Sequence, residues 1–226
     1  MKKLILFDLD GTLIDSLEDL AEAVNHALGL RGLPLHTVAE YRRMVGHGVR
    51  NLVKQALDAS ICHTERSERI SDRASDALID SALADFKAYY QAHIDVHTRP
   101  YHGIPELLTE LHAHAIQLAV VSNKFQEGTE YLINRFFPAI RFVAILGNKP
   151  GAPLKPDPEI VQEVLRRSGV SKEEALLVGD SPTDMKTAAN GGIESIAVTW
   201  GYRTAEDLAG HRQVHNVEEL RNQLLK

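Results

Sequence analysis

The segment LILFDLDGTL, residues 4–13, restricts the fold more than any other part of the sequence. Its first four residues are apolar and do not alternate with polar ones, which is typical of a short strand buried on both faces of a parallel sheet. The run leads directly into two acids, Asp8 and Asp10, and then into Gly11 and Thr12. Ligands of α/β proteins bind at the carboxyl ends of parallel strands. We therefore expect Asp8 and Asp10 to lie at the ligand-binding edge of a sheet.

Four later apolar runs resemble the first one, and they occupy residues 117–121, 140–145, 175–178 and 195–198. Segments with helical spacing lie between the predicted strands, among them IPELLTELHAH, EGTEYLINRFF and PEIVQEVLRRSG. The last of these segments closes on Gly169, and glycine commonly ends helices. This alternation predicts an α/β fold with a Rossmann-like parallel sheet and right-handed crossovers.

Residues 16–92 interrupt the alternation. Ser16 and Asp19 have the spacing of a capping box, and further helical patterns follow at 37–45, 48–59 and 75–91 without a strand signal. We expect an inserted, small α-helical cap domain at 16–92, while 1–15 and 93–226 together form a discontinuous α/β core domain. The polar segment HTERSERISDR, residues 63–73, is expected to be a solvated loop or helix edge.

Composition excludes several classes of protein. The chain has 226 residues, is 44% hydrophobic and carries a formal net charge of -6, with no basic stripe, which argues against nucleic-acid binding. No apolar stretch is long enough to span a membrane, and Asp8 interrupts the only segment that resembles a signal peptide. A single cysteine, Cys62, excludes an internal disulfide and a thiolate metal cage. A cytoplasmic location fits these features best.

The acids at the predicted strand ends indicate a metal site. Asp8 and Asp10 project to one side of an extended chain roughly 6–7 Å apart, and Asp180, after the 175–178 run, adds a third carboxylate. Three neighbouring carboxylates repel one another unless a cation lies between them. Because no histidine or cysteine follows these strands, Mg²⁺ suits the donor set better than Zn²⁺.

Other strand ends supply donors for an anionic substrate. Ser122 offers a hydroxyl and Asn123 a backbone N–H if a helix or tight turn begins there, while Lys155 in LKPDP offers a positive charge. Carboxylates, a divalent cation, a lysine and a hydroxyl at one edge of a sheet describe a phosphoryl-transfer site.

Four motifs in order, FDLDGTL, VVSN, LKP and VGDSPTD, resemble the signature motifs of the haloacid dehalogenase-like hydrolases. A helical insert after the first motif resembles that superfamily's caps. The resemblance implies that Asp8 is the nucleophile that forms an aspartyl-phosphate, and that Asp10 is the general acid and then the general base. It implies that the phosphoryl group is bound by Ser122, Asn123 and Lys155. It also implies that Mg²⁺ is bound by Asp8, the Asp10 carbonyl and Asp180, with Thr12 and Asp184 in support.

The second acid indicates which reaction to expect. Dehalogenases of the superfamily lack an acid at the position of Asp10 because a halide leaves without a proton, whereas an alkoxide needs one. The cap segment MVGHGVRNLV resembles that of phosphoglycolate phosphatases, and Gly46, His47 and Arg50 are its candidate substrate contacts. The expected activity is Mg²⁺-dependent hydrolysis of a small phosphorylated metabolite, with 2-phosphoglycolate as the leading candidate, by a monomer or homodimer.

Alternatives remain open for the function and for single residues. A pyrophosphatase or sugar-phosphate phosphatase would use the same chemistry, and a mutase like β-phosphoglucomutase or a receiver-type aspartyl-phosphate switch fits the pattern less well. The polar residues at the strand ends could instead have a purely structural role, as turn residues or helix caps. In SPTDM, for instance, Ser181 and Asp184 have the positions of an N-cap and N3 pair. His47 and Arg50 could be solvated side chains of a capping loop.

Overall fold

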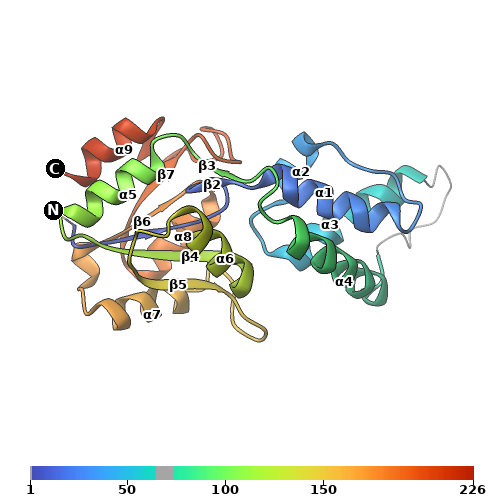
Figure 1. The fold of residues 1–226 in the computed structure, drawn as a ribbon, viewed down its shortest axis with the longest axis horizontal. Coiled ribbons are helices and arrows are strands. Elements are labelled where there is room, and N and C mark those ends of the chain that lie inside the picture. Colours follow the sequence, from blue (N-terminus) through green and yellow to red (C-terminus); the bar gives the residue numbers. More distant parts are fainter. Residues whose placement is uncertain (1, 65–73) are drawn as a thin grey trace. The chain divides into compact units, whose positions relative to one another are not determined.

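The computed structural model describes residues 2–64 and 74–226, and it separates into two compact units (Figure 1). The first, here named the core unit, consists of Met1–Asp15 and Arg99–Lys226, and the second, the helical unit, consists of Ser16–Thr98. The sequence pattern predicted the end of the inserted domain at residue 92, whereas the helical unit ends at Thr98. Whether the helical unit acts as a cap over a substrate stays a prediction.

The core unit is built on a six-stranded sheet in the order β5-β4-β1-β6-β7-β8, and all its neighbouring strands are parallel. Its strands are β1 (Leu4–Phe7), β4 (Gln117–Phe125), β5 (Phe142–Asn148), β6 (Ala175–Gly179), β7 (Glu194–Val198) and β8 (Gln213–Val214). Strand β4 continues four residues past its predicted end at 121. Two further strands, β2 (Ile14–Asp15) and β3 (Arg99–Pro100), pair antiparallel beside it. The predicted α/β fold class is confirmed.

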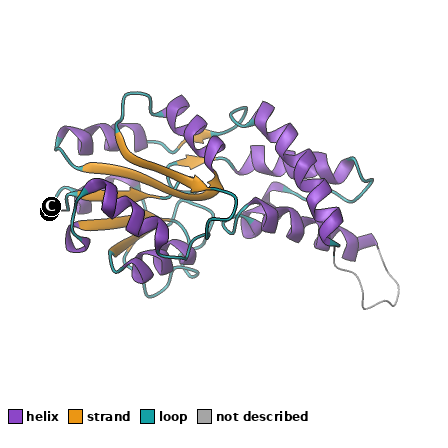
Figure 2. Ribbon diagram, turned by 90° about the horizontal axis from the view of Figure 1, so that it is seen from below, coloured by secondary structure: helices purple, strands orange, loops and turns teal. Residues whose placement is uncertain are grey.

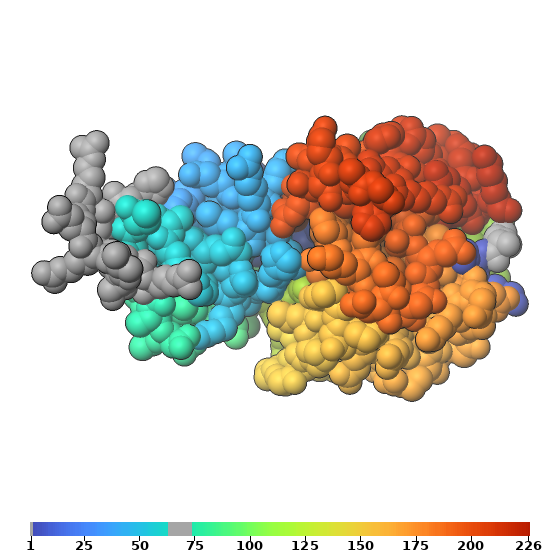
Figure 3. Space-filling view, turned by 180° about the vertical axis from the view of Figure 1, so that it is seen from behind, coloured from blue at the N-terminus to red at the C-terminus, as the bar shows by residue number. Residues whose placement is uncertain are grey.

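Helices cover both faces of this sheet (Figure 2). They are α5 (Ile104–Ala113), α6 (Gln126–Phe136), α7 (Glu159–Ser168), α8 (Pro182–Gly191) and α9 (Val217–Leu224), with a short 3₁₀ turn at Lys172–Glu174. Val161 and Val164 of α7 and Ala188 of α8 pack on Leu4 and Leu6 of β1 in a fully buried cluster. The C-terminal part of the chain, orange to red, forms a continuous surface of the core unit (Figure 3).

The helical unit consists of α1 (Leu17–Gly29), α2 (Val38–Met44), α3 (Val49–Thr64) and α4 (Asp76–His93). Its interior contains the fully buried rings of Tyr41, Phe86 and Tyr90. Thr37 and Glu40 form a capping box at the start of α2. Of the polar segment expected to be solvated, residues 65–73 lie outside the described part of the chain.

The predicted capping box at the start of α1 is wrong. Ser16 is the N-cap residue, but its side chain makes no capping hydrogen bond. The Asp19 carboxylate, which is buried, instead accepts hydrogen bonds from the backbone N–H groups of His97 and Thr98 at 2.9 Å, and from the Thr98 hydroxyl at 2.6 Å. A segment 78 residues away thus competes for the carboxylate that local spacing assigned to the cap.

Among the described residues, no helix combines the length and the apolar character that crossing a membrane requires.

Candidate active site

Three adjacent strands at the centre of the sheet bring the candidate residues together. Strand β1 lies between β4 and β6, with Phe7 level with Val120 on one side and Val178 on the other. Asp8 follows β1 directly and Asp180 follows β6, so both acids leave the sheet at the same edge. The convergence expected from the strand ends is therefore observed for these two residues.

Asp8, Asp180 and Asp184 form a buried acidic cluster, in which one carboxylate oxygen of each lies within 4.8 Å of the others. Burial, followed by the nearby Asp184 charge, raises the pKa of Asp8 to about 7, although Lys155 acts in the opposite direction. Burial and the charges of Asp184 and Asp8 likewise raise the pKa of Asp180 well above its ordinary value. The protein alone thus disfavours the ionised cluster.

This cluster fits a hard divalent cation. Its donors are oxygen atoms, it excludes water from most of each carboxylate, and it concentrates negative charge that Lys155 offsets only in part. The backbone carbonyl of Asp10 was predicted to be a further ligand of the cation, and this role stays a prediction. The third carboxylate of the acidic cluster belongs to Asp184.

Lys155 lies between two of these acids. Its Nζ is 2.9 Å from Asp8 Oδ1 and 2.7 Å from Asp184 Oδ1, and it donates to the Val121 carbonyl at 2.9 Å. Burial acts to lower the pKa of Lys155, but the adjacent charges of Asp184 and Asp8 outweigh burial and raise it. Lys155 is therefore a permanent cation beside the candidate nucleophile, not a surface lysine ahead of a proline turn.

Asn123 positions the lysine. Its Oδ1 accepts from the Lys155 backbone N–H at 2.8 Å, and its Nδ2 donates to the Lys155 carbonyl at 3.2 Å. No helix begins at Asn123, because β4 continues to Phe125 and α6 starts at Gln126. Helix capping by Ser122 or Asn123 is accordingly excluded, and the buried Ser122 hydroxyl accepts a hydrogen bond from the Lys124 backbone N–H at 3.2 Å.

Asp184 caps a helix and also contacts Lys155, and its support of a metal site stays a prediction. Its Oδ2 accepts from the backbone N–H and the hydroxyl of Ser181, so the capping box at the start of α8 is present. Its Oδ1 accepts from Lys155 at 2.7 Å. The side chain is completely buried, and one carboxylate thus connects the helix start to the site.

Two loops close around Asp180. Gly11 has φ of +89°, and a Cβ on it would lie 2.4 Å from Asp180 Oδ2, so a larger residue would collide with the carboxylate. The backbone N–H of Tyr202 donates to that same oxygen at 2.7 Å. The Trp200 indole N–H donates to the Thr12 carbonyl at 3.2 Å, while the buried Thr12 hydroxyl has no hydrogen-bond partner among the described residues.

Lys124 is a member of the site to which sequence analysis assigned no role. Its Nζ lies 3.1 Å and 3.3 Å from the two carboxylate oxygens of Asp10, and its side chain is 3% exposed. The available signal was its place directly after Ser122 and Asn123, where the chain was expected to reach the same edge of the sheet.

The three candidates in the cap segment lie in the helical unit. Gly46 and Gly48 have φ of +116° and +81°, which permits the tight turn between α2 and α3. Arg50 at the start of α3 forms ion pairs with Asp76 and Asp80 of α4, and its side chain is 46% exposed. The structure therefore gives Arg50 a role in joining α3 to α4, and its contact with a substrate stays a prediction.

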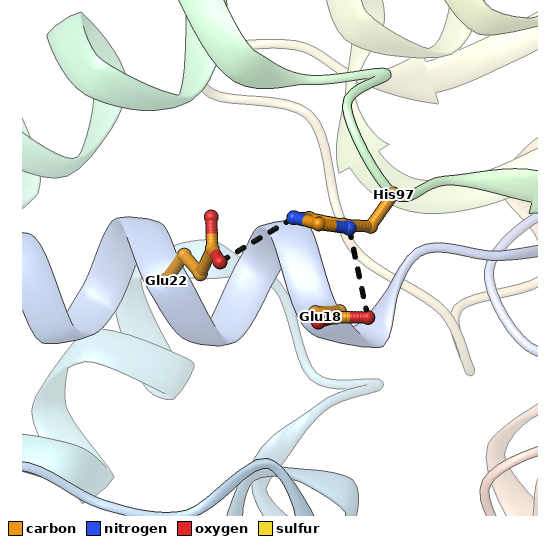
Figure 4. Close-up of side chains that lie close together, drawn as sticks. All are labelled: Glu18, Glu22 and His97. Carbon is orange, nitrogen blue, oxygen red and sulfur yellow. Dashed lines mark ion pairs between the residues drawn. The ribbon is translucent and has the colours of Figure 1, made fainter.

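A second group of titratable side chains lies in the helical unit. The His97 ring stands between the side chains of Glu18 and Glu22 of α1 (Figure 4), at 3.8 Å and 3.4 Å. All three side chains are at least 40% exposed, so these ion pairs, which require a protonated histidine, stabilise the unit only weakly.

Comparison with known proteins identifies the family. The family model "Haloacid dehalogenase-like hydrolase" matches residues 5–198, which include every motif that surrounds the acidic cluster. The chain belongs to this family. The resemblance inferred from the four motifs is confirmed, and the protein is a phosphoric monoester hydrolase of the haloacid dehalogenase-like type.

Similar proteins cover most of the chain. A phosphoglycolate phosphatase of Mesorhizobium japonicum is 36% identical over 89% of this chain and 84% of its own length. Phosphoglycolate phosphatase 1 of Pseudomonas aeruginosa is 32% identical over 99% of this chain and 79% of its own length. The crystal structure of a predicted phosphoglycolate phosphatase from Haemophilus somnus is 27% identical, has a TM-score of 0.86 and covers 98% of both chains.

Proposed function

We propose that this hydrolase cleaves 2-phosphoglycolate through an aspartyl-phosphate formed on Asp8. The observation that carries the chemistry is the position of Lys155 Nζ, 2.9 Å from Asp8 Oδ1, beside the acidic cluster. Relatives named phosphoglycolate phosphatase that are 30–36% identical over most of the chain support the choice of substrate.

In the first step, a carboxylate oxygen of Asp8 attacks phosphorus and the bond from phosphorus to the ester oxygen breaks. The electron pair of that bond remains on the ester oxygen, which takes a proton from the Asp10 carboxyl group. Covalent capture divides one difficult displacement into two easier ones. Lys155 offsets the repulsion between the Asp8 carboxylate and the incoming anion.

In the second step, the ionised Asp10 removes a proton from water as the water oxygen attacks phosphorus. The bond between phosphorus and Asp8 breaks, its electron pair returns to the Asp8 carboxylate, and inorganic phosphate is released. We expect the Ser122 hydroxyl and the Asn123 backbone N–H, both in β4, to donate hydrogen bonds to the phosphoryl oxygens in both steps.

Asp8, the Asp10 carbonyl and Asp180 would hold Mg²⁺, which supplies positive charge against the repulsion between the carboxylates and the phosphoryl group. The backbone N–H of Tyr202 fixes the Asp180 carboxylate, and Gly11 leaves room for it. Asp184 supports this arrangement by holding Lys155 and the start of α8. The donor set supports a magnesium site because all of its members are oxygen atoms.

The helical unit would act as the cap and select the substrate. Gly46 and Gly48 lie in the turn before α3 with positive φ, where a backbone without Cβ lets a ligand approach, and His47 and Arg50 would meet the substrate carboxylate. Arg50 would exchange at least one of its acidic partners on α4 for the substrate. We expect a monomer or homodimer that acts on a small metabolite in the cytoplasm, without nucleic acid or membrane.

A substrate panel with Mg²⁺ tests this function. Catalytic efficiency should be higher for 2-phosphoglycolate than for pyrophosphate or hexose phosphates. A preference for either of the latter would replace the substrate but keep the chemistry, whereas isomerisation of a sugar phosphate would indicate a mutase. Inactivity on every phosphomonoester would overturn the proposal, and a long-lived phosphoprotein without turnover would indicate a switch.

A further inference from the structure

Asp10 and Lys124 form a buried ion pair, and the reaction steps above assign no task to the lysine. Lys124 Nζ contacts both oxygens of the Asp10 carboxylate, at 3.1 Å and 3.3 Å. The Lys124 side chain is 3% exposed and the Asp10 side chain is 13% exposed. Burying an ammonium group costs several kcal/mol unless it is paired with an anion. The buried position of Lys124 therefore depends on its contact with Asp10.

The fold places this lysine on a rigid element. Phe7 of β1 is level with Val120 of the neighbouring strand β4. Asp10 lies three residues after Phe7, and Lys124 lies four residues after Val120, so the two reach a similar level. Lys124 still belongs to β4, and its backbone N–H is bound by the Ser122 hydroxyl. Asp10, in contrast, belongs to the turn that follows β1, where the backbone N–H of Gly11 donates to the Ile14 carbonyl. Lys124 is therefore anchored in β4, and it contacts the side chain of Asp10, which lies in a turn.

The two buried lysines divide the acids between them. Lys155 contacts Asp8 and Asp184, on the side of the candidate nucleophile. Lys124 contacts Asp10, the candidate proton donor. Contact with both carboxylate oxygens restrains the position of the Asp10 side chain relative to β4.

We propose that Lys124 is a positioning residue that orients the Asp10 carboxyl group toward the ester oxygen of the leaving alcohol. The inference rests on the proposed function, in which Asp10 delivers that proton. Proton transfer depends on the geometry of the donor, so the lysine matters when the leaving group needs a proton. It matters little for a phenolate that leaves without one.

The experiment compares kcat/KM of the full-length protein with Mg²⁺ for 2-phosphoglycolate and for p-nitrophenyl phosphate. Lys124→Met keeps much of the side-chain length and removes the charge, and it should lower kcat/KM for 2-phosphoglycolate by about 10- to 100-fold. For p-nitrophenyl phosphate the loss should stay below about threefold. Lys2→Met is the matched control, because Lys2 pairs with Glu194 near the opposite end of β1. This substitution should leave kcat/KM unchanged for both substrates.

A double mutant identifies the residue through which the lysine acts. In an Asp10→Asn background, Lys124→Met should cause almost no further loss with 2-phosphoglycolate. Lys124→Arg, which keeps the charge and offers two parallel N–H donors to the carboxylate, should recover most of the activity and remains informative if Lys124→Met folds poorly.

An equal loss for both substrates, or an undiminished loss in the Asp10→Asn background, would overturn the role of Lys124. Failure of the proposed substrate is distinguishable, because the wild-type protein would then hydrolyse p-nitrophenyl phosphate but not 2-phosphoglycolate. In that case glycerol phosphate replaces 2-phosphoglycolate as the alkyl ester, and the comparison between the two leaving groups is unchanged.

Discussion

In the absence of divalent cations, the free energy of unfolding of the protein should fall as the pH rises from 5 to 8. Burial raises the pKa of Asp8 from 3.8 to about 7, so between these values the folded state holds a proton that the unfolded state has lost. The contribution of protonated Asp8 to stability is complete below pH 3.8 and is lost as the pH rises through about 7. The full effect is about 4 kcal/mol, of which about 3 kcal/mol falls between pH 5 and pH 8.

Urea unfolding in EDTA measures this effect, and Asp8→Asn isolates it from the histidines. The variant carries an uncharged amide of the same shape, so its free energy of unfolding minus that of the wild type should grow by about 3 kcal/mol from pH 5 to pH 8. Excess Mg²⁺ should remove most of that growth, because a cation stabilises the ionised acids of the cluster. A difference that stays constant with pH in EDTA would refute the electrostatic account of the cluster.

Two further predictions concern the helical unit. Asp19→Ala should lower the free energy of unfolding by about 3 kcal/mol in urea titrations, because it removes the acceptor of the His97 and Thr98 backbone N–H groups and of the buried Thr98 hydroxyl. The neighbouring Glu18→Ala should cost about 0.5 kcal/mol or less, and equal losses would contradict this account. Arg50→Ala should raise KM for 2-phosphoglycolate more than for p-nitrophenyl phosphate, and an equal change in both would leave Arg50 as a link between α3 and α4.

The sequence predicted the sheet well because its central strands are continuous apolar runs. Asp8 and Asp180 directly follow such runs, so their position at one edge of the sheet follows from the parallel topology alone. Strands β2, β3 and β8 have two residues each, too few for any pattern, and none of them was predicted.

Side-chain partners were harder to predict because they depend on distant segments. Asp19 has the spacing of a capping residue, yet it binds the backbone at His97 and Thr98. Lys124 was expected near the same edge of the sheet but received no role, because its partner Asp10 lies 114 residues away in the sequence. Local spacing identifies which groups are available, and only the fold determines which of them meet.

The most direct test of phosphoryl transfer through Asp8 is rapid acid quenching during turnover, followed by mass spectrometry of the peptide that contains Asp8. With 2-phosphoglycolate and Mg²⁺, that peptide should carry a phosphoryl group that forms and disappears at rates compatible with turnover. Asp8→Asn should fold, show no labelled peptide and lose activity, because an amide does not attack phosphorus. Steady turnover without phosphorylated Asp8, or comparable activity of Asp8→Asn, would contradict the proposed mechanism.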